Sequence, residues 1–178
     1  TWLSKMKEMY GEESNFYRVH ILGEFPVASS DALIPFDDIT SAFDRDVKYI
    51  GHDTILGVDV GYGDDPSALC VRQGKDIIFV DQYQTKELMR LVGKIQEMVL
   101  QYKIKKIFID VIGVGAGVAE RLKQLNLLVY TVNVAECASM KAQFGRLRNE
   151  LWWKVREFFM SKDCHINPDI KFKDDFIG

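Results

Sequence analysis

Two aspartates, each at the end of a strand-like apolar run, constrain this chain more than any other feature. Asp59 lies near the end of the run Thr54-Ile-Leu-Gly-Val-Asp-Val-Gly, and Asp110 near the end of the run Lys106-Ile-Phe-Ile-Asp-Val-Ile-Gly. Short apolar runs bounded by glycine are typical of buried β-strands. A carboxylate at the end of such a strand is costly unless a partner compensates its charge. If the two strands lie side by side, both charges meet at one place, and a divalent cation is the simplest compensation.

Each aspartate also has a simpler interpretation, as a turn residue whose carboxylate binds nearby backbone amides. The equivalent position of Asp59 and Asp110 on two strands favours a metal site instead. Carboxylate oxygens suit Mg²⁺ or Mn²⁺, which are hard cations. Two such ions about 3.5–4 Å apart can activate a water and stabilise the leaving oxygen in phosphodiester hydrolysis. The pair therefore predicts metal-ion chemistry on an anionic substrate.

Composition limits the class of protein. The chain has 178 residues, 47% of them hydrophobic, and a net charge of −3. These values fit one soluble domain, and no apolar run approaches the ~18 residues of a membrane span. Three scattered cysteines indicate a reducing cytosol, and the absence of ligand spacing argues against zinc. The negative charge argues against non-specific nucleic-acid binding by the whole surface, but a local basic cluster stays possible.

From Thr54 onward the pattern of strands and helices is regular. Three strands joined by short turns predict an antiparallel meander. Thr85 can cap a helix whose apolar residues have 3–4 spacing. We expect an α/β fold with a mixed five-stranded sheet flanked by helices, in which the fourth strand lies parallel to the first. The expected strands are 54–60, 67–72, 77–83, 106–111 and 127–132. The expected helices are one that follows Thr85, with apolar positions from Leu88 to Val99, and two over 117–125 and 140–160.

Two loops beside the expected strand ends are further candidates. Asp65, after Asp64 in the first turn, is either an auxiliary ligand or an ordinary turn residue before Pro66. The run Gly113-Val-Gly-Ala-Gly117 lies between a strand and a helix. It matches a dinucleotide fingerprint imperfectly, so it is either a phosphate-binding helix start or a tight connection.

The last helix carries basic and aromatic residues. Arg146, Arg148 and Lys154 lie near Trp152 and Trp153. Such a face is able to contact a nucleic-acid backbone. A solvated, charge-bearing helix face is the alternative.

Four segments, in order, resemble the large terminase subunit of tailed bacteriophages. They are Phe16-Tyr-Arg-Val-His-Ile-Leu-Gly-Glu-Phe-Pro, Gly57-Val-Asp-Val-Gly with Asp64 and Asp65, Phe108-Ile-Asp-Val-Ile-Gly-Val-Gly-Ala-Gly, and Arg148-Asn-Glu-Leu-Trp-Trp. The third segment is the most specific of the four. The resemblance covers the end of the ATPase region and most of the nuclease domain.

The resemblance implies a ribonuclease H-like fold and a metal-dependent endonuclease that cuts concatemeric double-stranded viral DNA during packaging. It places Asp59 and Asp110 on the first two acidic positions of the family and Asp65 on an accessory one, with two Mg²⁺ or Mn²⁺ ions in a complete site. It also implies the portal protein, the small terminase subunit and the terminase ATPase domain as partners, no membrane, and the cytoplasm of the bacterial host.

The resemblance also implies domain limits, and the chain departs from the family pattern in two respects. Residues 1–50 correspond to the tail of the ATPase region and a linker, and residues 51–178 to the nuclease domain, truncated at its C-terminal end. The segment Asn167-Pro-Asp-Ile resembles the third acidic position only superficially. We expect that third carboxylate beyond Gly178, and the sequence contains no ATPase phosphate loop. If the 178-residue chain cuts DNA efficiently, the third carboxylate lies within it, and Asp169, Asp174 and Asp175 are the next residues to mutate.

Two other functions stay open from the sequence. An actin-like nucleotide-binding domain has a similar first strand, and ATP binding by calorimetry would identify it. A non-catalytic prophage remnant that docks on packaging partners would bind no metal.

Overall fold

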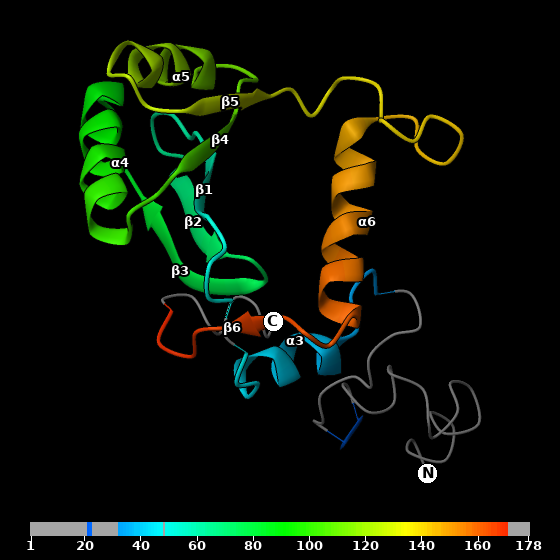
Figure 1. The fold of residues 1–178 in the computed structure, drawn as a ribbon. Coiled ribbons are helices and arrows are strands. Elements are labelled where there is room, and N and C mark those ends of the chain that lie inside the picture. Colours follow the sequence, from blue (N-terminus) through cyan, green and yellow to red (C-terminus); the bar gives the residue numbers. More distant parts are fainter. Residues whose placement is uncertain (1–20, 23–31, 48, 171–178) are drawn as a thin grey trace.

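The computed structural model describes residues 21–22, 32–47 and 49–170. These residues form a six-stranded mixed sheet with helices on both faces (Figure 1). The strands are β1 (Thr54–Asp59), β2 (Ser67–Gln73), β3 (Asp76–Tyr83), β4 (Lys106–Asp110), β5 (Val129–Val132) and β6 (His165–Ile166). The helices are α3 (Phe36–Phe43), α4 (Leu88–Tyr102), α5 (Gly115–Gln124) and α6 (Leu147–Met160).

The strand order is β5-β4-β1-β2-β3-β6. The chain β1-β2-β3 is the expected antiparallel meander, and β4 and β5 run parallel to β1 on its other side. The predicted fold class and the predicted neighbourhood of the first and fourth strands are therefore confirmed. The structure adds a short sixth strand, β6, which pairs in parallel with β3.

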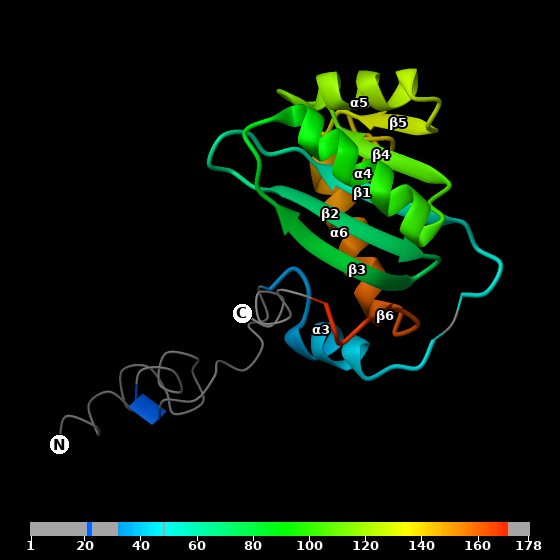
Figure 2. The same ribbon diagram turned by 90° about the vertical axis from the view of Figure 1, so that its left-hand side faces the viewer.

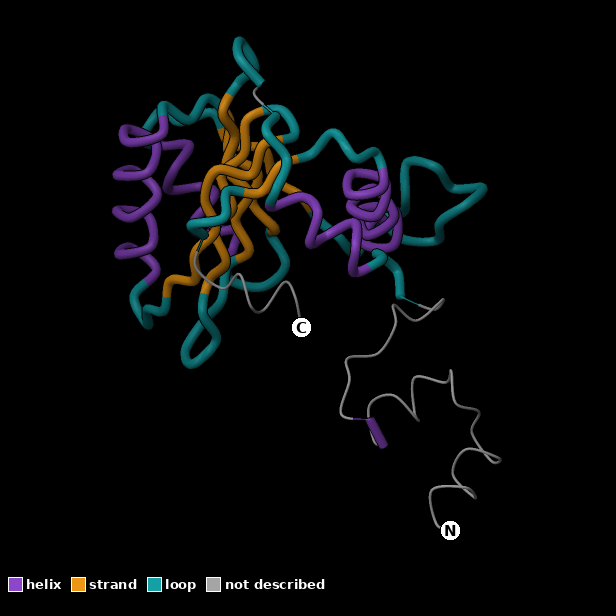
Figure 3. Tube along the Cα trace, turned by 90° about the horizontal axis from the view of Figure 1, so that it is seen from below, coloured by secondary structure: helices purple, strands orange, loops and turns teal. Residues whose placement is uncertain are grey.

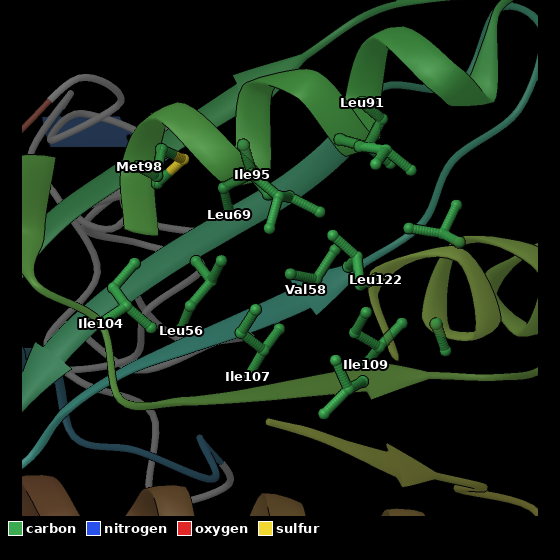
Figure 4. Close-up of a cluster of buried hydrophobic side chains, with 14 of the residues drawn as sticks. Leu56, Val58, Leu69, Leu91, Ile95, Met98, Ile104, Ile107, Ile109 and Leu122 are labelled. Atoms are coloured by element: carbon green, nitrogen blue, oxygen red, sulfur yellow. The ribbon is translucent and has the colours of Figure 1, made fainter. Parts of the chain in front are cut away.

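One face of the sheet forms the main hydrophobic core with α4 and α5. Alternate residues of the central strands, such as Leu56, Val58, Ile107 and Ile109, are buried there. Figure 4 shows them meeting the apolar stripe of α4. The stripe is the one that the 3–4 spacing predicts, with Leu91, Val92, Ile95 and Met98 all buried. Because strand side chains alternate, the residues between them point to the opposite face.

Helix α6 lies on that opposite side. Figure 2 places it behind the sheet, with α4 in front, and Figure 3 shows the strands between helices on two sides. Its C-terminal half belongs to a second apolar cluster, in which Phe159 meets Phe43 of α3 and Ile166 of β6. Arg45 closes this cluster by donating hydrogen bonds to the Cys164 carbonyl (3.2 Å) and the Ser41 hydroxyl (2.5 Å).

Several element boundaries differ from the sequence predictions. Thr85 does not cap α4, because its hydroxyl accepts the Glu87 N–H at 3.1 Å and closes a turn before the helix. Helix α6 begins at Leu147, whereas the predicted helix began at residue 140. The apolar pattern also predicts a short helix over 1–10 and a strand over 16–22, but the helix and most of the strand lie outside the described residues. Within the described part of the chain, no helix is long and apolar enough to span a bilayer.

Candidate metal centre

Asp59 and Asp110 end two neighbouring parallel strands in matching register. Val58 pairs with Ile109, so the two aspartates are the next residues on β1 and β4. Val58 and Ile109 point into the main core, so Asp59 and Asp110 share the face toward α6. Adjacent strands lie about 4.8 Å apart, which suits carboxylates that share ions about 3.5–4 Å apart.

The free oxygens of this pair fit a divalent cation. Asp59 is exposed, and its carboxylate accepts no hydrogen bond from the described residues. Asp110 is half-buried, and its Oδ1 accepts the Ile112 N–H at 3.0 Å. The remaining oxygens are hard donors that suit Mg²⁺ or Mn²⁺. No third His, Cys, Asp or Glu joins them among the described residues.

The turn after Asp110 is held by a close backbone approach. Gly115 begins α5 directly against Asp110, and a Cβ at this position would lie 2.0 Å from the Asp110 carbonyl oxygen. Gly113 has φ +72°, a conformation that glycine adopts without strain. The glycine run is thus a tight strand-to-helix connection that fixes the end of β4.

An open cavity of about 380 Å³ lies in front of the two carboxylates. Its other wall is α6, and the lining residues are Asp59, Asp110, Val134, Arg148, Leu151, Trp152 and Val155. A second, mainly apolar cavity of about 520 Å³ continues along the same face of the sheet, past Phe108 and Cys70. The site is therefore a cleft between the sheet and α6, with its charged groups at one end.

The structure separates the three basic residues that the sequence grouped as candidate DNA contacts. Arg148 lines the cavity, and its side chain forms no ion pair with the described residues. Arg146 is the exposed residue before α6 and lies outside the cavity lining. Lys154 is bound to the Glu150 carboxylate at 2.5 Å. Only Arg148 thus shares the cavity with the carboxylate pair.

The accessory acidic candidates lie outside this cavity. Asp65 is exposed in the turn after β1, where its N–H donates to the Tyr62 carbonyl. Asp64 is 95% exposed and lies 3.7 Å from the Lys86 ammonium. Asp169 follows β6, at the far edge of the sheet, and its N–H donates to the Asn167 side chain. Asp174 and Asp175 lie outside the described residues.

The sequence did not identify the face of α6 that forms one wall of the cleft. Arg148, Leu151, Trp152 and Val155 have the spacing i, i+3, i+4, i+7 and so share one helix face. The sequence pattern places Phe144, Leu147, Leu151, Val155 and Phe158 on one apolar stripe of this helix. That stripe contains Leu151 and Val155 but leaves out Arg148 and Trp152. Both Leu151 and Val155 are partly exposed in the cleft, at 36% and 39%.

Comparisons with known proteins agree with this architecture at the level of fold. No family model matches the sequence, and no curated protein matches it. The nuclease domain of the large terminase subunit gp2 of bacterial virus Sf6 is 13% identical, with a TM-score of 0.62 over 82% of this chain and 77% of that one. A mutant form of that domain, with manganese and beta-thujaplicinol, gives a TM-score of 0.65 at the same identity and coverage.

A second phage gives the same result. The large terminase nuclease from thermophilic phage G20c, with bound magnesium, is 15% identical, with a TM-score of 0.60 over 79% of this chain and 76% of that one. The chain therefore has the ribonuclease H-like fold of phage large terminase nuclease domains. The family resemblance seen in the sequence is confirmed as a likeness of fold.

Proposed function

We propose that this chain is a metal-dependent endonuclease domain of a phage DNA-packaging terminase. The observation that carries the proposal is the placement of Asp59 and Asp110 on adjacent strand ends, facing one open cavity. The fold it shares with two phage terminase nuclease domains supports the same function.

In this proposal Asp59 and Asp110 hold and orient two Mg²⁺ or Mn²⁺ ions. When bound, such ions lower the pKa of water and offset charge on a phosphodiester. Arg148, on the opposite wall, binds a phosphate oxygen of the DNA through its planar guanidinium. Asp65 is an accessory acidic residue near the first strand. Arg146 and Lys154 lie outside the cavity and contribute only longer-range attraction to the DNA backbone.

The substrate of this proposal is double-stranded viral DNA in concatemers. An open cleft with an exposed carboxylate pair suits a polymer that passes along the surface. The proposed partners are the terminase ATPase domain, the small terminase subunit and the portal protein, in the cytoplasm of the bacterial host. Residues 1–50 are the tail of the ATPase region and a linker in this view. Helix α3, which lies within that segment, packs against α6 and β6.

Isothermal titration with Mn²⁺ and a plasmid-cleavage assay test the proposal. Asp59→Asn and Asp110→Asn should each weaken Mn²⁺ binding at least about tenfold and abolish cleavage, because each removes a carboxylate ligand. Asp64→Asn is the matched control, since it makes the same charge change on an exposed residue outside the cavity.

Unchanged Mn²⁺ binding in both strand-end variants would remove the metal site from the proposal. ATP binding by the wild-type chain, without cleavage, would favour a nucleotide-binding domain. Chelator should abolish any cleavage, and Mg²⁺ or Mn²⁺ should restore it.

A further inference from the structure

Glu150 is a buried carboxylate that the proposed chemistry leaves unused. It is fully buried, at 0% exposure, although it belongs to α6, most of whose surface is exposed. Its oxygens accept hydrogen bonds from the Ser139 N–H (2.6 Å), the Ser139 hydroxyl (2.5 Å) and the Met140 N–H (3.3 Å). The Lys154 ammonium binds the same carboxylate at 2.5 Å. These four donors hold the pKa of Glu150 at about 2.

These bonds join α6 to the segment 133–140, which follows β5. The Leu147 N–H also donates to the Glu136 carbonyl (2.8 Å), and the Arg148 N–H to the Val134 carbonyl (3.1 Å). The first two N–H groups of the helix are therefore satisfied by this segment, and the Glu150 carboxylate in the first turn is buried against it. At its other end, α6 is held by Phe159 in the second apolar cluster.

Helix geometry links this attachment to the cleft. At 3.6 residues per turn, Glu150 lies about 200° around the helix from Arg148, and Trp152 lies about 40° from Arg148. Fixing Glu150 against the loop therefore turns Arg148 and Trp152 toward the carboxylate pair. A rotation of the helix would move Arg148 out of the cavity without changing β1 or β4.

We infer that Glu150 is a positioning residue: its contacts with Ser139 and Met140 set the rotation of α6 that places Arg148 opposite Asp59 and Asp110. This inference rests on the proposed function, because it gives Arg148 its role in holding DNA phosphate. It adds a residue outside the cleft that controls the geometry of the cleft.

Electrostatics and positioning predict opposite signs for one substitution. Removing a negative charge from a DNA-binding surface strengthens DNA binding. If Glu150 positions Arg148, Glu150→Gln weakens DNA binding instead, because Arg148 no longer meets the phosphate. Glu157→Gln is the matched control, since it makes the same change about two turns along α6. Glu157 is exposed, and among the described residues its carboxylate accepts only the Trp153 indole N–H.

The test measures the affinity of the chain for a fluorescein-labelled DNA duplex by anisotropy at low salt with Ca²⁺, and Mn²⁺ affinity by titration. Glu150→Gln and Arg148→Ala should each weaken DNA binding about tenfold, the scale of one charge-assisted hydrogen bond. The double variant should bind no more weakly than either single variant. Mn²⁺ affinity should change less than twofold, and Glu157→Gln should bind DNA as wild type or slightly more tightly.

Hydrogen exchange supplies a readout that does not depend on DNA. Glu150→Gln should speed exchange of amides in 134–140 and at Leu147 and Arg148, while β1 and β4 stay protected. Unchanged exchange there, or DNA binding as tight as in Glu157→Gln, would overturn the inference. The inference would also be overturned if the loss of DNA affinity in the double variant equalled the product of the losses in Glu150→Gln and Arg148→Ala. A wild-type chain that binds neither Mn²⁺ nor DNA would instead overturn the proposed function, and with it the role of Arg148.

Discussion

Gly115→Ala should displace Asp110 in the candidate metal centre and destabilise the fold. The added Cβ would lie 2.0 Å from the Asp110 carbonyl oxygen, whereas carbon contacts are optimal at about 3.5–4.0 Å. The methyl group therefore lacks about 1.5 Å of room, and backbone must move because the clashing atom is itself a backbone oxygen. Overpacking of this kind costs about 1–3 kcal/mol, and a carbonyl contact belongs near the upper end.

The gain in helix propensity from glycine to alanine, about 0.5–1 kcal/mol, offsets part of this cost. The net loss is then about 2 kcal/mol, or a fall in Tm of about 4–8 °C at about 2–4 °C per kcal/mol. A shift of about 1 Å at Asp110 should also lower cleavage about 100-fold. Thermal unfolding followed by circular dichroism measures the fall in Tm, and a plasmid-cleavage assay measures the loss of activity. A Mn²⁺ titration of the folded protein reports whether metal binding changes as well.

Gly117→Ala is the control for Gly115→Ala. It lies two residues further along α5, with nothing within 4 Å of its added Cβ. It should raise Tm by about 1–4 °C through propensity alone and leave Mn²⁺ binding unchanged. If Gly115→Ala were as stable as Gly117→Ala and bound Mn²⁺ equally well, the close approach would not fix Asp110.

The other predictions concern charges at the cleft. Asp110→Asn should leave DNA affinity unchanged or slightly increased in an anisotropy assay, although cleavage is lost, because a negative charge near the phosphates is removed; a loss of DNA binding would contradict this separation. Asp65→Asn should lower the cleavage rate only in part, and full activity would return Asp65 to a turn role. Hydrogen bonds from Lys154 and Ser139 lower the pKa of Glu150 from 4.5 to about 2. Its carboxylate therefore stabilises the fold fully above about pH 5, and this contribution is lost as pH falls from 4.5 through 2. The Tm difference between wild type and Glu150→Gln should be constant above pH 5 and shrink below pH 4.5, and a constant difference down to pH 2 would refute the linkage.

Local patterns were sufficient to predict the central part of the fold. The apolar spacing of α4 is determined by its own sequence, because one face must be buried against the sheet. The parallel pairing of β1 and β4 follows from the helical crossover between them. The two aspartates were therefore placed correctly at neighbouring strand ends from sequence patterns alone.

Features that depend on distant contacts were missed. Strand β6 has only two residues, and its pairing with β3 depends on residues nearly ninety positions apart. The start of α6 at Leu147 depends on Glu150, whose carboxylate binds the Ser139 and Met140 amides and keeps that stretch out of the helix.

The sequence alone likewise did not show which basic residue of α6 faces the candidate site. Arg148 and Lys154 lie on the same helix, and spacing alone does not reveal which one faces the sheet. The rotation of α6 decides it, and that rotation is fixed by the burial of Glu150 and Phe159.

The strand order has a consequence for how the site responds to heat. β1 and β4 each have a paired strand on both sides, whereas β5 and the two-residue β6 form the edges. Edge strands open in local fluctuations, but interior strands open only when most of the domain does. The spacing of Asp59 and Asp110 should therefore persist until global unfolding, so that Mn²⁺ binding is lost only within the main melting transition and not in an earlier step.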